Sequence, residues 1–158
     1  MKAMFPGSFD PITKGHLDII ERASKIFDEV LVVLMQNPMK EYSFKADLRK
    51  ELVERSIEHL SNVKVLIGTG LTVEFAQKHD IKVLIRGIRE VMDYEYEIQQ
   101  ATINMLLNEN IETFFMISKP EFSFLSSSAC KVVARNHGDI ARFVPKAVIK
   151  IIEDKYKK

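Results

Sequence analysis

The segment Ala3–His16 contains the residues whose types and spacing most clearly suggest chemistry. An apolar run is followed by bends at Pro6-Gly7 and Asp10-Pro11, and Thr13 then precedes the pair Gly15-His16. Thr13 suits the N-cap of a helix, because apolar residues recur at helical spacing after it. The free N–H groups and positive dipole end of a helix N-terminus attract anions, and a histidine adds a donor. The pattern is typical of a phosphate site, although a turn carrying a surface imidazole would show it too.

Further cations and hydroxyl groups follow other predicted strands. Lys40 follows the second strand, Arg86 and Arg89 follow the fourth, and Lys131 comes shortly after the serines 126–128. Serine hydroxyls and N–H groups at a second helix N-terminus could also bind phosphate oxygens. Together these groups offer more positive charge than one monophosphate requires. We therefore expect a polyphosphate, or two phosphorylated substrates held together.

Several catalytic classes lack their signatures in this chain. It contains neither a P-loop nor Gly-x-Gly-x-x-Gly, and Gly68-Thr69-Gly70 is only a fragment that indicates a turn. The Gly-x-Ser-x-Gly elbow is also missing, so Ser8 with His16 and Asp18 is a weak hydrolase candidate. No strong general base accompanies the candidate phosphate site. A phosphate nucleophile needs none, since its second pKa lies near ~6. We expect catalysis by alignment and charge neutralisation.

Strand-like and helix-like segments alternate along the chain. The predicted strands span residues 3–5, 30–35, 63–67, 81–85 and 111–117. The predicted helices run from Gly15 to about Phe27, from an Asp47 cap to Leu60, over 72–79, 93–107 and 129–135, and from Pro145 through Ile152. Such alternation indicates a Rossmann-like α/β fold, a doubly wound five-stranded parallel sheet. Since no repeat or linker is visible, we expect residues 1–158 to form a single domain.

The polar residues singled out above should meet at one rim of this sheet. In parallel sheets of this kind, ligands bind outside the carboxyl ends of the strands. The residues that follow the five predicted strands, in order, are Ser8 and His16, Asn37 and Lys40, Gly70–Thr72, Arg86 and Arg89, and Ser126–Ser128. We expect them to converge there.

Composition narrows the range of partners. The chain has 158 residues and a net charge of +1, with both signs mixed along it, which argues against a nucleic-acid partner. Its one cysteine, Cys130, allows no internal disulfide and suits a reducing cytoplasm. The apolar run 30–35 is far shorter than the roughly 20 residues of a spanning helix, and no signal peptide is visible, so we expect no membrane partner.

The predicted helix 93–107 carries apolar residues on more than one face. One set comprises Ile98, Ala101 and Met105, and a second comprises Ile103 and the pair Leu106-Leu107. A helix with two apolar faces often packs against two neighbours. We expect oligomerisation, and the alternative is a helix buried within the domain.

Four blocks of the chain resemble the nucleotidylyltransferase superfamily, and within it the bacterial enzymes that adenylylate phosphopantetheine. The superfamily signature Thr/His-x-Gly-His matches Thr13–His16, and its serine-rich second signature matches Ser126–Ser128. The blocks are Pro6–Pro11, Leu84–Arg89, Asp93–Glu97 and Phe122–Ser128. They occur in the family order, and the similarity runs from Ala3 to about Tyr156 without large gaps. The resemblance implies transfer of AMP from ATP to 4′-phosphopantetheine, giving dephospho-coenzyme A and pyrophosphate.

The resemblance also implies roles for individual residues. His16, Lys40 and Arg89 would be catalytic, with His16 stabilising the pentacoordinate phosphorus and the leaving pyrophosphate. Phosphopantetheine would contact Ser8, Lys40, Thr72 and Arg86. ATP would contact Ser8, Phe9, His16, Gly87, Ile88, Arg89, Glu97, Phe122, Ser123, Phe124, Leu125, Ser126, Ser127 and Ser128.

The remaining expectations concern cofactor, assembly and location. The chain shows no Asp-rich metal cage, so we expect Mg²⁺ to arrive with ATP. By resemblance the protein would be a cytoplasmic homohexamer, with coenzyme A as a feedback ligand.

Small departures from the family pattern and a related function stay open at this point. Thr72 stands where Leu or Met is common, Glu41 where a second lysine is common, and Leu125 where Ile is usual. A nucleotidylyltransferase of the same fold could instead use another phosphorylated acceptor, such as nicotinamide mononucleotide. A non-catalytic nucleotide-binding module is the alternative from a different class.

Overall fold

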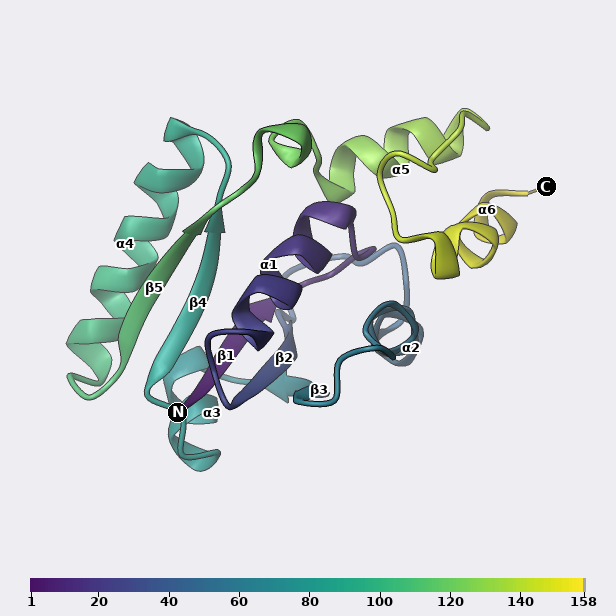
Figure 1. Cartoon of the computed structure of the whole chain (residues 1–158). Helices are drawn as coiled ribbons and strands as arrows, with labels where there is room; N and C mark the ends of the chain where they lie inside the picture. The colour runs from purple at the N-terminus through teal and green to yellow at the C-terminus, as the bar shows by residue number, and fades with distance from the viewer. Residues whose placement is uncertain (158) are drawn as a thin grey trace.

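The computed structural model describes residues 1–157, which fold around a five-stranded parallel sheet (Figure 1). The strands lie in the order β3-β2-β1-β4-β5. Their bounds are β1 (Lys2–Gly7), β2 (Glu29–Gln36), β3 (Val63–Thr69), β4 (Val83–Ile88) and β5 (Glu112–Ile117). The predicted Rossmann-like fold is confirmed.

Helices cover both faces of the sheet. They are α1 (Lys14–Ser24), α2 (Ala46–Ser56), α3 (Thr72–Lys78), α4 (Val91–Leu107), α5 (Ser127–Arg135) and α6 (Ile149–Tyr156), with 3-10 turns η1 (Pro120–Phe122) and η2 (Lys146–Val148). Side chains alternate along β1, so Ala3 and Phe5 join the larger core with α1, α2, α5 and α6, whereas Met4 joins the smaller core with α3. Burial on both faces explains the continuous apolar runs of the central strands.

Several predicted element ends are wrong by a few residues. Helix α2 begins at Ala46, so Asp47 lies inside its first turn rather than capping it. Phe27 and Leu60 lie beyond the ends of α1 and α2, and they reach the core from turns. Strand β4 begins at Val83 rather than Ile81, and it continues through Ile88. Apolar residues at helical spacing indicate burial rather than helix itself. A buried turn residue just beyond a helix can therefore continue the same spacing.

Strands β1 and β4 separate towards their carboxyl ends. Strand β1 pairs with β2 over its whole length, from Lys2 to Gly7. It pairs with β4 only at Ala3 and Met4. The strand order also reverses at β1, since β2 and β3 lie on one side and β4 and β5 on the other. The fold therefore opens a crevice at the point where sheets of this class bind ligands.

Helix α4 exposes most of its apolar residues. Glu97 is its only buried residue within the described chain, whereas Met92 is 77% exposed and Leu106 is 83% exposed. The alternative that this helix is buried within its own domain is therefore wrong. None of the helices within residues 1–157 is long and apolar enough to cross a membrane.

Candidate active site

A cavity of about 290 Å³ lies where β1 and β4 separate. Its walls come from the end of β1 and the turn after it, the first turn of α1, the end of β4 and the start of α5. The predicted site residues that line it are Ser8, Phe9, His16, Arg86, Gly87, Arg89, Glu97, Leu125, Ser126 and Ser127. The predicted convergence of residues that follow separate strands is thus confirmed for six of them, Ser8, His16, Arg86, Arg89, Ser126 and Ser127.

A second cavity of about 480 Å³ adjoins the first. It contains Lys40 and Thr72, and the two cavities share the stretch Pro6–Ser8 and Arg86 as a common wall. A third hollow of about 880 Å³ shares Lys40 and Thr72 and continues to Leu107 at the end of α4. The site is therefore elongated, with Ser8 and Arg86 at the junction of its two parts.

Five of the residues expected to contact ATP, Ile88 on β4 and four of the serine-rich block, do not line the first cavity. Ile88 is buried, Phe124 is 60% exposed, and the Ser123 hydroxyl donates to the Pro120 carbonyl. Phe122 and Ser128 do not line the first cavity either. The ATP contacts that the resemblance implies for these five residues stay predictions, as do those of the residues that line the cavity.

The imidazole of His16 is held by the N-terminus of its own helix. Thr13 caps α1, and its backbone N–H donates to His16 Nδ1 at 3.0 Å, which completes a capping box. Because Nδ1 accepts this bond, the ring proton resides on Nε2. Burial, together with the positive charges of Arg89 and Arg86, lowers the pKa of His16 to about 4. His16 is thus a neutral donor at physiological pH.

Aromatic side chains also pack against the His16 imidazole. The rings of Phe9 and His16 meet edge to face with centroids 5.0 Å apart, and Phe5 packs edge to face on Phe9 at 5.4 Å. Phe9 adopts a positive φ of 46°, which turns its ring back over Gly7. A Cβ at Gly7 would lie 2.9 Å from that ring, so the turn requires glycine there. The chain thereby restricts His16 from several sides.

Arg86 bridges the end of β1 to α4. Its Nε and Nη2 donate to the two carboxylate oxygens of Glu97 at 2.5 and 2.6 Å, and its Nη1 donates to the Pro6 carbonyl at 2.7 Å. The bidentate pairing fixes the guanidinium plane. The buried Glu97 therefore holds Arg86 at the junction of the two cavities.

Arg89 plays a similar part in the first cavity. It forms a fork with the Asp93 carboxylate and also donates to the backbone carbonyl of Leu125. Arg89 therefore connects the end of β4 to the loop before α5. In that loop the Ser126 hydroxyl caps α5 by accepting from the Ala129 N–H.

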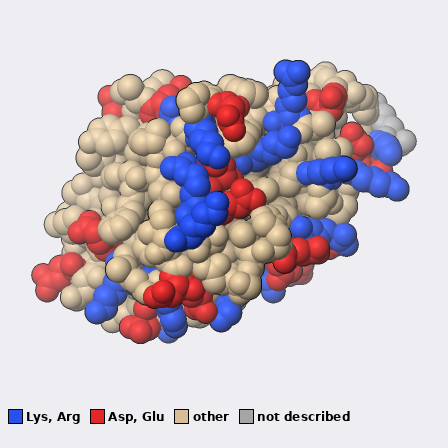
Figure 2. All heavy atoms as spheres, viewed as in Figure 1, with Lys and Arg blue, Asp and Glu red and all other residues tan. Residues whose placement is uncertain are grey.

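The rim is less positive than the sequence suggests. Arg86 pairs with Glu97, Arg89 pairs with Asp93, and Lys131 pairs with Asp10 at 3.3 Å. No carboxylate of residues 1–157 lies within ion-pair distance of Lys40, whose ammonium donates to the Ser8 hydroxyl at 3.1 Å. Figure 2 shows basic and acidic side chains intermixed across the face in view. A count of cations along the sequence could not reveal these pairings.

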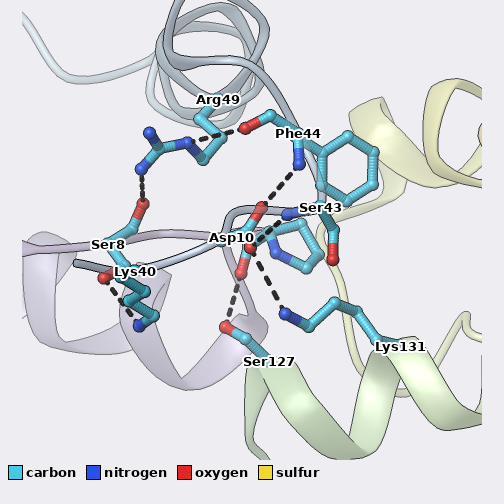
Figure 3. Close-up of polar contacts among 9 residues, drawn as sticks. Ser8, Asp10, Lys40, Ser43, Phe44, Arg49, Ser127 and Lys131 are labelled. Carbon is cyan, nitrogen blue, oxygen red and sulfur yellow. Dashed lines mark hydrogen bonds and ion pairs between the residues drawn. The ribbon is translucent and has the colours of Figure 1, made fainter. Parts of the chain in front are cut away.

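A polar cluster that no sequence pattern indicated lies next to Ser8 and Lys40 (Figure 3). Arg49 is 1% exposed, and its guanidinium lies 3.9 Å from the centre of the Tyr42 ring. Asp10 is 2% exposed and accepts hydrogen bonds from the loop between β2 and α2. Asp10 appeared in the sequence only as a turn residue, and a lone arginine on a helix is usually solvated. No local pattern distinguishes such residues, since distant segments bury them.

Comparisons with known proteins agree with this geometry. Residues 4–133 match the model of the family described as Cytidylyltransferase-like, the class that this fold and site define. The chain is 46% identical over 157 residues to the phosphopantetheine adenylyltransferase of Staphylococcus haemolyticus, covering 99% of this chain and 98% of that protein. The chain belongs to the phosphopantetheine adenylyltransferase family within that class.

A solved structure supports the fold independently. A crystal structure of a proposed nicotinate-nucleotide adenylyltransferase from Vibrio parahaemolyticus matches with a TM-score of 0.74. The match covers 99% of this chain and 96% of that one at 18% sequence identity. At this identity the likeness concerns the architecture alone.

Proposed function

We propose that this protein transfers AMP from ATP to 4′-phosphopantetheine, giving dephospho-coenzyme A and pyrophosphate. The observation that carries the proposal is the 46% identity, over nearly the full length of both chains, to a phosphopantetheine adenylyltransferase. The elongated site fits two phosphorylated substrates, since two cavities share one wall. ATP would occupy the first cavity, and the acceptor would occupy the second.

The reaction would be an in-line displacement at the α-phosphorus of ATP. A phosphate monoester is largely dianionic at neutral pH, so the acceptor phosphate attacks without a protein base. The bond from the α-phosphorus to the bridging oxygen then breaks, and pyrophosphate leaves with its electron pair. The protein aligns the two phosphates and neutralises the charge that develops between them.

His16 would stabilise this transition state through Nε2–H. Its pKa of about 4 keeps the ring neutral, so it donates a hydrogen bond without giving up a proton. The Thr13 cap and the Phe9 ring hold it in place before substrate binds. A donor fixed in advance costs no reorganisation as charge develops.

The junction of the cavities would position the acceptor phosphate. Lys40 and Arg86 supply its positive charge, and the Ser8 hydroxyl supplies a hydrogen bond. Thr72 would contact the pantetheine arm further along the second cavity. Arg89 would contact the nucleotide phosphates from the other side, aided by the start of α5.

Mg²⁺ would enter with ATP. The carboxylates of Asp93 and Glu97 line the first cavity, but each is engaged by an arginine. Phosphate oxygens and water are therefore its expected ligands, as is usual for this ion. Mg²⁺ would add charge neutralisation on the phosphates.

We extend the proposal to organisation and location. Residues 1–158 would act as one nucleotidylyltransferase domain, and copies would assemble as a homohexamer in the cytoplasm. Coenzyme A, which carries the product's chemistry, would be a feedback ligand. No nucleic acid or membrane partner is proposed.

A substrate panel tests the reaction and the acceptor together. Pyrophosphate release from MgATP is measured with 4′-phosphopantetheine, with nicotinamide mononucleotide and without acceptor. Release with phosphopantetheine alone is expected. Release with nicotinamide mononucleotide alone would overturn the acceptor, and ATP binding without any release would indicate a binding module.

Replacing Lys40 by alanine tests the acceptor end of the site. Lys40 lacks a carboxylate partner within residues 1–157, so its charge is available to a ligand. We expect the KM for phosphopantetheine to rise by about tenfold or more, while the KM for ATP changes little. Steady-state kinetics with each substrate varied in turn measures both. Unchanged acceptor KM and kcat would contradict the role.

A further inference from the structure

The loop between β2 and α2 carries Lys40, and two buried charged side chains hold its far end. The backbone N–H of Phe44 donates to Asp10 Oδ1 at 2.9 Å, and that of Ser43 donates to Asp10 Oδ2 at 2.8 Å. The carbonyl of Phe44 accepts from Arg49 Nε at 3.0 Å. Charged groups therefore hold both polar groups of one loop residue (Figure 3).

Arg49 also contacts the turn at Ser8, which lines the second cavity, where the acceptor is proposed to bind. Its Nη1 donates to the backbone carbonyl of Ser8 at 2.7 Å, and its Nη2 donates to the Gln36 side chain at 3.1 Å. The Tyr42 ring stacks on the same guanidinium. One side chain thus connects the turn after β1, the end of β2 and the loop that carries Lys40.

This bridge lies directly behind the contact between Lys40 and Ser8. The Lys40 ammonium reaches the Ser8 hydroxyl at 3.1 Å and lies 5.6 Å from the centre of the Tyr42 ring. Arg49 contacts the backbone of Ser8, whose hydroxyl accepts from Lys40. It also contacts the Tyr42 ring, which lies near the Lys40 ammonium. Burying a guanidinium with no carboxylate within ion-pair distance in residues 1–157 is unfavourable unless its donors are satisfied. Here three donors are satisfied, by the carbonyl of Ser8, which lines the second cavity, and by Gln36 and Phe44, which adjoin or end the segment that carries its lining residues Asn37, Lys40 and Tyr42.

We propose that Arg49 is a positioning residue for the acceptor phosphate, acting by holding the Lys40 loop against the turn at Ser8. The inference rests on the proposed function, since it assigns the acceptor to this cavity. Asp10 assists from the opposite side of the Phe44 peptide. Arg49 itself is buried and lines neither of the two adjoining cavities, so it would not touch the acceptor.

The test compares wild type with Arg49→Lys, which keeps the charge but loses the planar fork. We expect the acceptor KM to rise about tenfold, kcat to fall, and the KM for ATP to stay within about twofold. Arg55→Lys, on the exposed side of the same helix, is the matched control and should change neither constant. A loss of thermal stability with unchanged kinetics, or an equal rise of both KM values, would overturn the proposal.

A double-mutant cycle with Lys40→Ala shows whether Arg49 acts through Lys40. In the Lys40→Ala background, Arg49→Lys should change the acceptor KM by no more than about twofold, because no ammonium is left to position. Independent, multiplying effects would contradict this. If Arg49→Lys does not fold, Gln36→Leu removes one of the three contacts, and it must raise the acceptor KM selectively for the proposal to stand.

A readout without turnover separates this inference from the proposed reaction. Hydrogen exchange of the Phe44 amide should accelerate in Arg49→Lys, while exchange in α5 stays unchanged. Unchanged exchange at Phe44 would refute the positioning role even in an active enzyme. Absence of pyrophosphate release from the wild type would refute the proposed reaction instead.

Discussion

At the scale of single residues, His16 owes its chemistry to its neighbours in sequence. The Thr13 cap orients Nδ1 and leaves Nε2–H as the donor, so four consecutive residues set the tautomer. This part of the site could be predicted from the sequence, because a capping box is a local pattern. The partners of Arg86 and Arg89 could not, because a bidentate contact depends on the angle at which β4 meets α4.

Removing the imidazole should slow the chemical step rather than weaken binding. We expect His16→Ala to lower kcat by about 10²-fold or more, as is usual when one donor to a developing charge is lost. The KM values for ATP and acceptor should change little. Stopped-flow or steady-state pyrophosphate release measures this. A variant with full kcat and weakened substrate affinity would show that His16 serves binding alone.

The depressed pKa of His16 has a definite sign in pH titrations. Between about pH 4 and the ordinary value of 6.5, the unfolded chain binds a proton that folded His16 excludes. The free energy of unfolding should therefore decrease as the pH falls below 6.5 and through this window. In NMR spectra, the His16 ring, assigned by its absence in His16→Ala, should stay neutral at pH 5.5. A midpoint near 6.5 would contradict the burial argument.

At the scale of elements, the strands were predictable and the loop between β2 and α2 was not. Apolar runs such as Val30–Met35 identify strands buried on both faces, so the sheet followed from the sequence. The start of α2 differs from the prediction because Asp47 resembles a cap, whereas the helix begins at Ala46, and Asp10 and Arg49 hold Phe44 two residues before it. The contact of Asp10 with Phe44 joins segments more than thirty residues apart, and that of Arg49 buries a charge. No local sequence pattern indicates either contact.

Alanine in place of two glycines near strand ends should have opposite effects on stability and on the KM for ATP. A Cβ at Gly87 would meet Ile19 at an ordinary 3.5 Å, but Gly87 lines the first cavity. A Cβ at Gly68 would lie 2.7 Å from Met35 and 2.8 Å from Val33. We expect Gly87→Ala to keep its stability and raise the KM for ATP, and Gly68→Ala to lose about 1–3 kcal/mol with the KM for ATP unchanged. Thermal melts of both variants measure the stability change, and steady-state kinetics measures the KM for ATP. Equal loss of stability in the two would contradict the prediction for Gly87.

At the scale of the whole molecule, the exposed apolar side chains of α4 favour contact with a partner. Soluble monomers rarely expose so many large apolar side chains together. They are Val91, Met92, Tyr94, Tyr96, Ile98, Ile103, Met105, Leu106 and Leu107. The proposed homohexamer would bury part of this face.

A charge placed on this face should dissociate the assembly without unfolding the chain. Leu106 is 83% exposed in the single chain, so Leu106→Asp costs the fold little. We expect light scattering to give a multiple of the 18.2 kDa chain mass for wild type and a smaller mass for the variant. Val132→Asp, which is 58% exposed on α5, is the matched control. A wild type that runs as a monomer would refute the assembly.

The internal ion pairs of the site bear on how substrates are captured. Arg86 and Arg89 are already neutralised by Glu97 and Asp93, and the whole chain carries a net charge of only +1. Long-range attraction of a polyanion grows with uncompensated charge and weakens with added salt. Encounter with ATP should consequently depend only weakly on ionic strength. In the proposed mechanism these arginines would bind phosphate strongly only after a bound substrate competes with Glu97 and Asp93 for them, so the protein would discriminate at close contact rather than at a distance.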